Sequence, residues 1–215
     1  MANENFKGFI KAAQRKGIVM RAIKSIFGIV ILSASVSACA QNKVEAAPKL
    51  ASDNPPMIQT PPPIIFLNDN LDEKDKLGWC IDTKGRGLTE QLHAHSCKPA
   101  NSDPEFRFDD DVLFSYDNVS GQIRSATYEN KCAQILDKHA EVDFGLLDCD
   151  ENNQAQKFSY NVETYELHPR GKTDQCMSAG EESAVAGPFM SRTLLLLPCN
   201  QAAPELKRWT ILTNG

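Results

Sequence analysis

Residues 80–97 read CIDTKGRGLTEQLHAHSC, and two later stretches also begin and end with a cysteine. Residues 132–149 read CAQILDKHAEVDFGLLDC, and residues 176–199 read CMSAGEESAVAGPFMSRTLLLLPC. The cysteines lie 17, 17 and 23 residues apart, and each stretch is followed by one large aromatic residue, Phe114, Phe158 or Trp209. A feature that recurs three times at intervals of about 45 to 50 residues is an internal repeat. It predicts a pseudo-threefold domain.

The local patterns inside these repeats favour an all-β fold. Short apolar or alternating runs occur at residues 64–67, 112–116, 144–147, 158–160 and 194–197, separated by turn residues such as Asn118, Gly121 and Gly171. No stretch beyond residue 40 has a sustained helical period. A closed all-β arrangement leaves few strand edges exposed, which suits strands this short.

The beginning of the chain has the layout of an export signal. Residues 20–38 read MRAIKSIFGIVILSASVSA: a basic start, a short apolar run and then small residues. Residues 36–39, VSAC, resemble the lipobox of bacterial lipoproteins, which implies lipidation of Cys39. An ordinary cleaved signal with an incidental cysteine is the alternative. Ala40, which is not aspartate, favours the outer membrane by resemblance to the bacterial sorting pattern, and residues 1–19 then indicate an upstream start codon.

The sequence therefore divides into three parts. Residues 1–38 hold the upstream extension and the signal, and residues 39–63 form a proline-rich tether that cannot bury enough apolar surface to order itself. Residues 64–215 have the length of one domain.

The six remaining cysteines are expected to be oxidised, since the protein is exported and their number is even. Six cysteines allow 15 pairings, and the sequence alone leaves these open. Pairing within each repeat is favoured because it closes a small loop there, worth about 3 kcal/mol. The pairs would be Cys80–Cys97, Cys132–Cys149 and Cys176–Cys199.

Together these motifs resemble the ricin-type β-trefoil lectin family. CIDTKG (residues 80–85) and LHAHSC (residues 92–97) match the first half of its repeat. QKF (residues 156–158) keeps the Gln-x-aromatic motif with Phe in place of Trp, and KRW (residues 207–209) keeps the Trp and loses the Gln. The resemblance covers nearly all of residues 64–215 and implies a β-trefoil, with Phe158 and Trp209 in a shared core.

The resemblance also implies a sugar site in the first repeat, formed by Asp82, His93, His95 and Asp111. The carboxylate of Asp82 would accept hydrogen bonds from sugar hydroxyls. His93 occupies the family's polar position, His95 its stacking position, and Asp111 the place of an Asn. If His95 stacks on a sugar, binding is expected to weaken as the ring protonates near pH 6 to 7.

The same positions in the other repeats lack this chemistry, so at most one lobe is expected to bind sugar. They are Gln134, Gly145, Leu147 and Ala155 in the second repeat and Ser178, Leu195, Leu197 and Leu206 in the third.

Three other readings remain open but are disfavoured. His93 and His95 with Cys97 could bind a metal, but a cysteine in a disulfide supplies no thiolate. The run Asp109 to Asp111 lacks the alternating spacing of a calcium loop. Asp82 and Asp111 could form a catalytic carboxylate pair, yet no nucleophile elbow, zinc-protease helix or nucleotide loop is present, and trefoils of this family bind without catalysis. We therefore expect no enzyme, no metal and no cofactor.

Charge and architecture narrow the partners. A net charge of −5 without a basic stripe disfavours nucleic acid. The expected function is a carbohydrate-binding lipoprotein anchored by lipid in the bacterial outer membrane, on its periplasmic face or at the cell surface. The alternative is a protein-binding trefoil that resembles the delivery subunits of cytolethal distending toxins, although the chain has only Trp79 and Trp209 where such subunits carry an aromatic cluster.

Overall fold

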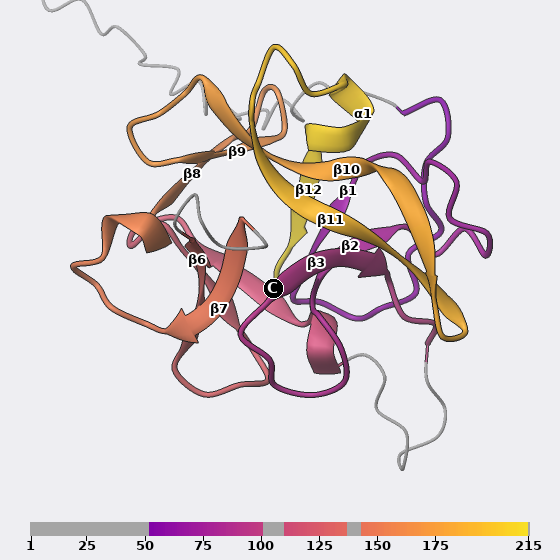
Figure 1. Ribbon diagram of the computed structural model, residues 1–215, viewed down its shortest axis with the longest axis horizontal. Coiled ribbons are helices and arrows are strands. Elements are labelled where there is room, and N and C mark those ends of the chain that lie inside the picture. Colours follow the sequence, from indigo (N-terminus) through magenta and orange to yellow (C-terminus); the bar gives the residue numbers. More distant parts are fainter. Residues whose placement is uncertain (1–51, 101–109, 137–142, 215) are drawn as a thin grey trace, which may run out of the picture. The chain divides into compact units, whose positions relative to one another are not determined.

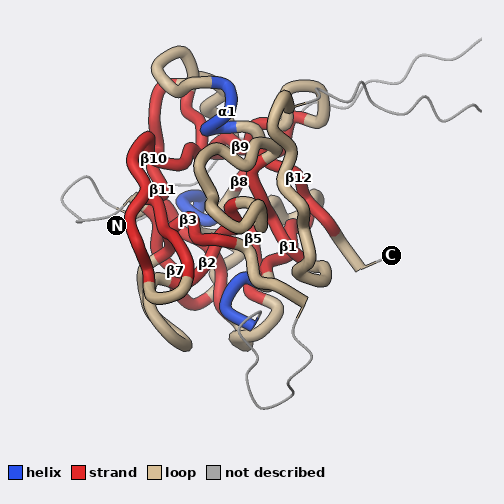
Figure 2. The backbone as a smooth tube through the Cα atoms, turned by 90° about the vertical axis from the view of Figure 1, so that its right-hand side faces the viewer, coloured by secondary structure: helices blue, strands red, loops and turns tan. Residues whose placement is uncertain are grey.

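The computed structural model describes residues 52–100, 110–136 and 143–214, and strands dominate them. Figure 2 shows that the helical segments are short. The strands are β1 (Ile64–Leu67), β2 (Trp79–Thr83), β3 (Leu92–Ser96), β4 (Phe114–Asp117), β5 (Gln122–Ser125), β6 (Lys131–Ile135), β7 (Phe144–Asp148), β8 (Phe158–Asn161), β9 (Glu166–Pro169), β10 (Gln175–Ala186), β11 (Phe189–Pro198) and β12 (Trp209–Leu212). The helical segments are the 3-10 turns Asp110–Val112 and Gln154–Gln156 and the single-turn helix α1 (Pro204–Lys207).

The strand pairing defines a β-trefoil, as the resemblance implied. Three antiparallel pairs, β1 with β12, β4 with β5 and β8 with β9, belong to the barrel, and three hairpins, β2–β3, β6–β7 and β10–β11, close it on one side. Each third of the chain contributes four consecutive strands (Figure 1). We call these thirds lobe one (β1–β4), lobe two (β5–β8) and lobe three (β9–β12).

The threefold relation extends to individual backbone hydrogen bonds. The backbone amide of the aromatic residue that follows each cysteine pair donates to the carbonyl of the residue just before the first strand of its lobe. Phe114 donates to Pro63, Phe158 to Gly121 and Trp209 to Tyr165, at 3.0, 2.7 and 2.7 Å. The three aromatic side chains are fully buried. Their contacts join the lobes in one apolar core, as predicted for Phe158 and Trp209.

Each lobe contains its own disulfide, which confirms the predicted pairing. Cys80 is bonded to Cys97, Cys132 to Cys149 and Cys176 to Cys199, with a Cα–Cα distance of 5.0 Å in all three. In each lobe the bridge joins the first strand of the hairpin to the residue at or just after the end of the second. The bridges therefore close each hairpin at its base.

The chain packs on lobe one before the predicted domain boundary at Ile64. Thr60 is buried, its hydroxyl donates to the carbonyl of Lys98 at 2.7 Å, and it accepts from the amide of Lys98 at 2.7 Å. The amides of Met57 and Asn70 donate to the carbonyls of Lys76 and Asn54. Residues 52–63, which the sequence assigned to the tether, therefore belong to the domain, because their backbone groups find partners on it.

The β10–β11 hairpin is longer than the other two and extends beyond its own lobe. β11 pairs with the edge of β3, where Ser191 lies opposite His95 and Arg192 opposite Ala94. The register of β10 shifts between Ala179 and Ser183, and Arg192 donates to the carbonyl of Gly180 at this irregularity, at 2.7 Å. The hairpin thus lies beside lobe one (Figure 1). Within the described ranges, no helix is long and apolar enough to cross a membrane.

Candidate functional site

Strands β2 and β3 bring three of the four predicted sugar-site residues together. Asp82 lies directly opposite His93 in the ladder, and His95 follows two residues later on the same face, because alternate residues of a strand point to one side. The two imidazole rings are 5.1 Å apart, and Nδ1 of His95 lies 3.5 Å from Oδ2 of Asp82. The structure therefore brings these three side chains close together.

A fourth group, the ammonium of Lys98, lies between them, and the sequence analysis missed it. Its Nζ is 2.8 Å from Oδ2 of Asp82 and 2.7 Å from Nδ1 of His95. The same Nδ1 also lies 3.0 Å from the carbonyl oxygen of Ser96. It accepts from the ammonium when the proton of the neutral ring is on Nε2, and it donates to the Ser96 carbonyl when the proton is on Nδ1. A basic residue directly after Cys97 was the available signal.

Burial shifts the pKa values of Asp82 and of the two histidines. Removal from water raises the pKa of Asp82 to about 6, although the Lys98 ammonium opposes this shift. Burial also lowers the pKa of His93 to about 3 and that of His95 to about 4, and the Lys98 charge adds to both shifts. Both rings are therefore neutral near pH 7. The expected loss of binding through protonation of His95 near pH 6 to 7 does not fit a pKa this low.

The hairpin of lobe three covers this cluster. The ring of Phe189 lies edge-on to His95, with centroids 5.6 Å apart, and 4.8 Å from the Lys98 Nζ. Asp82 and His95 retain only 2% and 8% of their exposure. Phe189 thus packs against the predicted stacking residue, His95.

Two polar atoms of the cluster have no hydrogen-bond partner among the described residues. They are Oδ1 of Asp82 and Nε2 of His93, and both are buried. A buried polar group without a partner costs about 1–3 kcal/mol. The cluster is thus incompletely satisfied by the protein itself.

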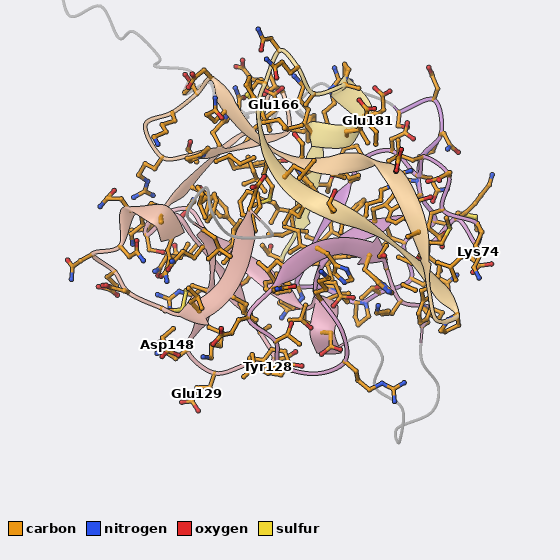
Figure 3. The ribbon with its side chains drawn as sticks, viewed as in Figure 1. Lys74, Tyr128, Glu129, Asp148, Glu166 and Glu181 are labelled. Carbon is orange, nitrogen blue, oxygen red and sulfur yellow. A yellow bond between two sulfur atoms is a disulfide. The ribbon has the colours of Figure 1, made fainter. Side chains whose placement is uncertain are left out.

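His93 also borders an open cavity of about 560 Å³ between β3 and the β10–β11 hairpin. Its lining is mixed: Lys84, Asp143, Glu181 (Figure 3), Ser191 and Thr193 contribute polar groups, and Leu195 is apolar. His93 is the one residue shared between this cavity and the predicted site.

The fourth predicted residue, Asp111, does not contact the cluster directly. One of its carboxylate oxygens accepts from the hydroxyl of Tyr128 (Figure 3) and the other from the amide of Gly87, at 3.2 Å for the latter. Its charge is close enough to contribute to the raised pKa of Asp82. Asp110 and Asp111 lie in a 3-10 turn. Asp109, the first residue of the possible calcium site, lies outside the described residues.

In lobe two, Gln134 takes the position that Asp82 has in lobe one, and it stabilises the fold. The carboxamide oxygen of Gln134 accepts from Asn153 at 2.8 Å and from Gln156 at 3.0 Å. Gln156, the Gln of the Gln-x-aromatic motif, also donates to the carbonyl of Asp148 and accepts from the amide of Asp150. This motif is therefore a structural hydrogen-bond network that ties the 3-10 turn to β7.

The remaining predicted site residue, Cys39, lies outside the described residues. Lipidation at this position stays a prediction.

The likenesses found among known proteins are to solved structures. No family model matches the sequence, and no curated protein does either. Among solved structures, the β-trefoil lectin of the Vibrio vulnificus hemolysin/cytolysin, with N-acetyl-D-lactosamine bound, has a TM-score of 0.46 and 17% identity, and the match covers 71% of this chain and 93% of that one. The solution structure of the mdaA-1 domain has a TM-score of 0.47 and 13% identity, with 72% and 92% covered. The assignment of the fold depends on the strand pairing described above, not on these two likenesses.

Proposed function

We propose that this chain is a ricin-type β-trefoil binding module that takes a carbohydrate on lobe one. The observation that supports this most directly is the unequal chemistry of the three lobes. Among the residues that the structure describes, lobe one alone places a carboxylate and two imidazoles on the face of its hairpin, and His93 of this set borders a cavity of about 560 Å³.

The cavity has the mixed lining that a sugar requires. Sugar hydroxyls need donors and acceptors, which Lys84, Asp143 and Ser191 supply, while the apolar faces of the ring can contact Leu195. His93 presents a neutral imidazole at this border. Asp82 is a buried anion paired with Lys98 and does not line the cavity. A sugar in the cavity therefore contacts His93 and not Asp82.

The proposed module is not an enzyme. Asp82, the one buried carboxylate of the cluster, is neutralised by an ammonium at 2.8 Å, and Asp111 is engaged by Tyr128 and Gly87. Neither is arranged as a carboxylate pair that flanks a scissile bond.

A single shallow site of this kind binds weakly, and anchoring compensates. We propose that the lipid on Cys39 holds many copies on the bacterial outer membrane, so that avidity raises the effective affinity for a multivalent glycan. The tether between Cys39 and the domain provides reach.

A second candidate is a protein-binding trefoil, and a different surface favours it. At the open end of the barrel, Tyr116, Tyr160 and Ile211 line a cavity of about 650 Å³. Val162, which also lines it, is 60% exposed, and Val119 is 85% exposed. Apolar side chains exposed around a hollow are typical of surfaces that contact another protein.

The test is a glycan-array and calorimetric screen of residues 45–215. We expect at least one glycan to bind, and His93→Ala to weaken that binding at least tenfold while the thermal unfolding midpoint stays within a few degrees. Glu151→Ala, in an exposed turn of lobe two, is the matched control and should leave binding unchanged. Equal binding by the His93 variant and the native protein would refute the site, and the absence of any glycan ligand would favour the protein-binding candidate.

A further inference from the structure

The three disulfides occupy equivalent places in the lobes, but each has a different neighbour on the adjacent barrel strand. Phe66 of β1 lies opposite Cys80, and Arg124 of β5 lies opposite Cys132. In lobe three the corresponding position on β9 is His168, which contacts the bridge itself. The threefold repeat thus provides three versions of one bridge in a single molecule.

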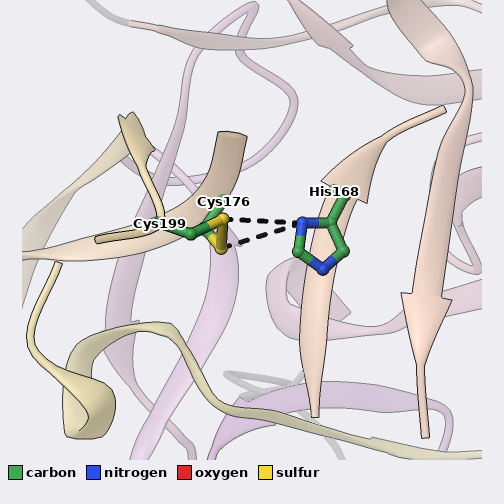
Figure 4. Close-up of side chains that lie close together, drawn as sticks. All are labelled: His168, Cys176 and Cys199. Carbon is green, nitrogen blue, oxygen red and sulfur yellow. Dashed lines mark hydrogen bonds between the residues drawn. A yellow bond between two sulfur atoms is a disulfide. The ribbon is translucent and has the colours of Figure 1, made fainter. Parts of the chain in front are cut away.

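The imidazole of His168 is directed at both sulfurs of the third bridge (Figure 4). Its Nδ1 lies 3.7 Å from Sγ of Cys176 and 3.6 Å from Sγ of Cys199. The same nitrogen is 2.9 Å from the carbonyl oxygen of Gln175, so it carries a proton that it donates there. An N–H group is therefore already in place beside the sulfurs.

Two charged side chains, those of Glu166 and Lys207, lie close to this imidazole and to the bridge. Nε2 of the imidazole lies 3.6 Å from a carboxylate oxygen of Glu166. The other oxygen of Glu166 is 3.0 Å from Nζ of Lys207, and this ammonium also donates to the carbonyl of Cys199 at 2.6 Å. A thiolate formed at this bridge would therefore lie near the ammonium of Lys207.

Exposure alone does not distinguish the third bridge from the second. Cys132 and Cys176 are fully buried, while their partners Cys149 and Cys199 are partly exposed. The first bridge is fully buried and packs in an apolar cluster with Phe66. The second and third bridges are thus matched in access and differ in the group that faces them.

We propose that Cys176–Cys199 is a thiol-exchange site, at which a small-molecule or protein dithiol reacts faster than at the other two bridges. The thiolate of the dithiol attacks the partly exposed Sγ of Cys199. The S–S bond breaks, its electron pair goes to Sγ of Cys176, and a mixed disulfide forms between Cys199 and the dithiol. The second thiol of the reagent then displaces Cys199 as a thiolate and leaves as the oxidised cyclic or intramolecular disulfide.

His168 acts in the first of these steps as the group that receives the leaving sulfur. The departing Cys176 thiolate accepts a hydrogen bond from the N–H at Nδ1 of His168. A leaving thiol with a lower pKa departs faster, and a hydrogen bond donated to its thiolate lowers that pKa. Phe66 offers no such donor in lobe one, and in lobe two the guanidinium of Arg124 donates to the side chain of Gln122.

The experiment follows all three bridges in the native chain at once. The protein is treated with limiting dithiothreitol, quenched with iodoacetamide at set times, and mapped by mass spectrometry for alkylated cysteines. We expect Cys176 and Cys199 to be alkylated first, about fivefold faster than Cys132 and Cys149. Equal rates at the second and third bridges would overturn the proposal.

Variants assign the effect to His168. His168→Phe, which installs the residue of lobe one, should remove the fivefold advantage and leave the rate at Cys132–Cys149 unchanged as an internal reference. Glu166→Gln should reduce the advantage in part. An unchanged advantage in His168→Phe, or slowing of all bridges alike in that variant, contradicts the role given to His168. These outcomes are independent of glycan binding.

Discussion

Asp82 and Lys98 form an ion pair that is almost completely removed from water. Their side chains retain 3% and 6% of their exposure, and their charged atoms are 2.8 Å apart. Lys131 and Asp148 in lobe two have the same separation, but the carboxylate is 79% exposed. The two pairs share one geometry and differ in solvation, which makes the second a control for the first.

Replacing Lys98 by methionine should therefore destabilise the domain far more than Lys131→Met. Loss of one partner leaves a buried carboxylate uncompensated, which costs about 3–5 kcal/mol, whereas loss of a surface pair costs about 0–1 kcal/mol. Urea unfolding at pH 7 measures both. The cost of Lys98→Met should shrink near pH 4.5, because Asp82 then takes up a proton. If both variants lose the same stability, Asp82 is not buried as described.

The histidines predict a loss of stability in mild acid. The lowered pKa values of His93 and His95 contribute stability that is present above pH 6.5 and is lost as the pH falls towards about 4 and 3. Asp82 opposes this trend, because its raised pKa contributes stability that is lost as the pH rises through about 6. Two rings outweigh one carboxylate, so unfolding between pH 6 and 5 takes up about one proton, worth about 1.4 kcal/mol per pH unit.

This slope can be measured by urea unfolding at pH 7, 6 and 5. His93→Leu removes one of the two rings, so the remaining ring and Asp82 should nearly cancel and the slope should flatten. A slope equal to that of the native protein would show that His93 is not the group that titrates.

The sequence could predict part of this cluster. The alternation of a strand places His93 and His95 on one face, and the hairpin pairing places Asp82 beside them. It could not predict that Lys98 would bend back over the strand end, since this depends on the contact of Lys98 with Thr60, 38 residues earlier. Phe189 comes from another lobe, so no local pattern revealed it.

At the scale of elements, the β10–β11 hairpin differs most from the predicted pattern. The run of leucines at residues 194–197 predicted a strand, and β11 includes it. Gly180, Glu181 and Glu182, which have low strand propensity, lie in the register shift of β10. Beyond this shift β10 pairs with β11 again from Ser183, and β11 in turn pairs with β3. The larger cysteine spacing of the third repeat was the one sign of this extension.

Phe189 should hold this hairpin against lobe one. Phe189→Ala removes the ring contacts with His95 and Lys98, and we expect a loss of about 1–3 kcal/mol, less than for a fully buried ring because Phe189 is partly exposed. Hydrogen exchange should become faster at residues 92–98 in particular. Val185→Ala, on the same hairpin at 84% exposure, is the control and should change neither quantity. Unchanged exchange in Phe189→Ala would mean that the backbone pairing of β11 with β3 alone keeps the cluster closed.

At the scale of the whole molecule, the threefold repeat was predicted because it is written in spacing and residue type. The cysteine pairs, the aromatic residue after each pair and the glycine turns recur in the same order in each repeat. Each disulfide forms within one repeat, so few long-range pairings had to be predicted. The sequence predicts a domain that begins at Ile64, whereas residues 52–63 also pack on it. Their proline-rich composition conceals the backbone hydrogen bonds that fix them. Composition predicts whether a segment can order itself, not whether a neighbouring surface orders it.

Replacing whole cysteine pairs by alanine tests how independent the lobes are. The first two bridges close loops of the same length, 17 residues, so the chain-entropy cost of losing either is the same, about 3 kcal/mol. Cys80 and Cys97 are both fully buried in an apolar cluster, whereas Cys149 is partly exposed. The Cys80/Cys97 double variant should therefore cost an additional ~1 kcal/mol for the cavity it leaves. Because the two bridges lie in different lobes and share no contact among the described residues, the losses should add within about 0.5 kcal/mol in the fourfold variant. Chemical unfolding of the three proteins measures each loss, and a combined loss well below the sum would mean that the lobes unfold as partly separate units even in the native protein.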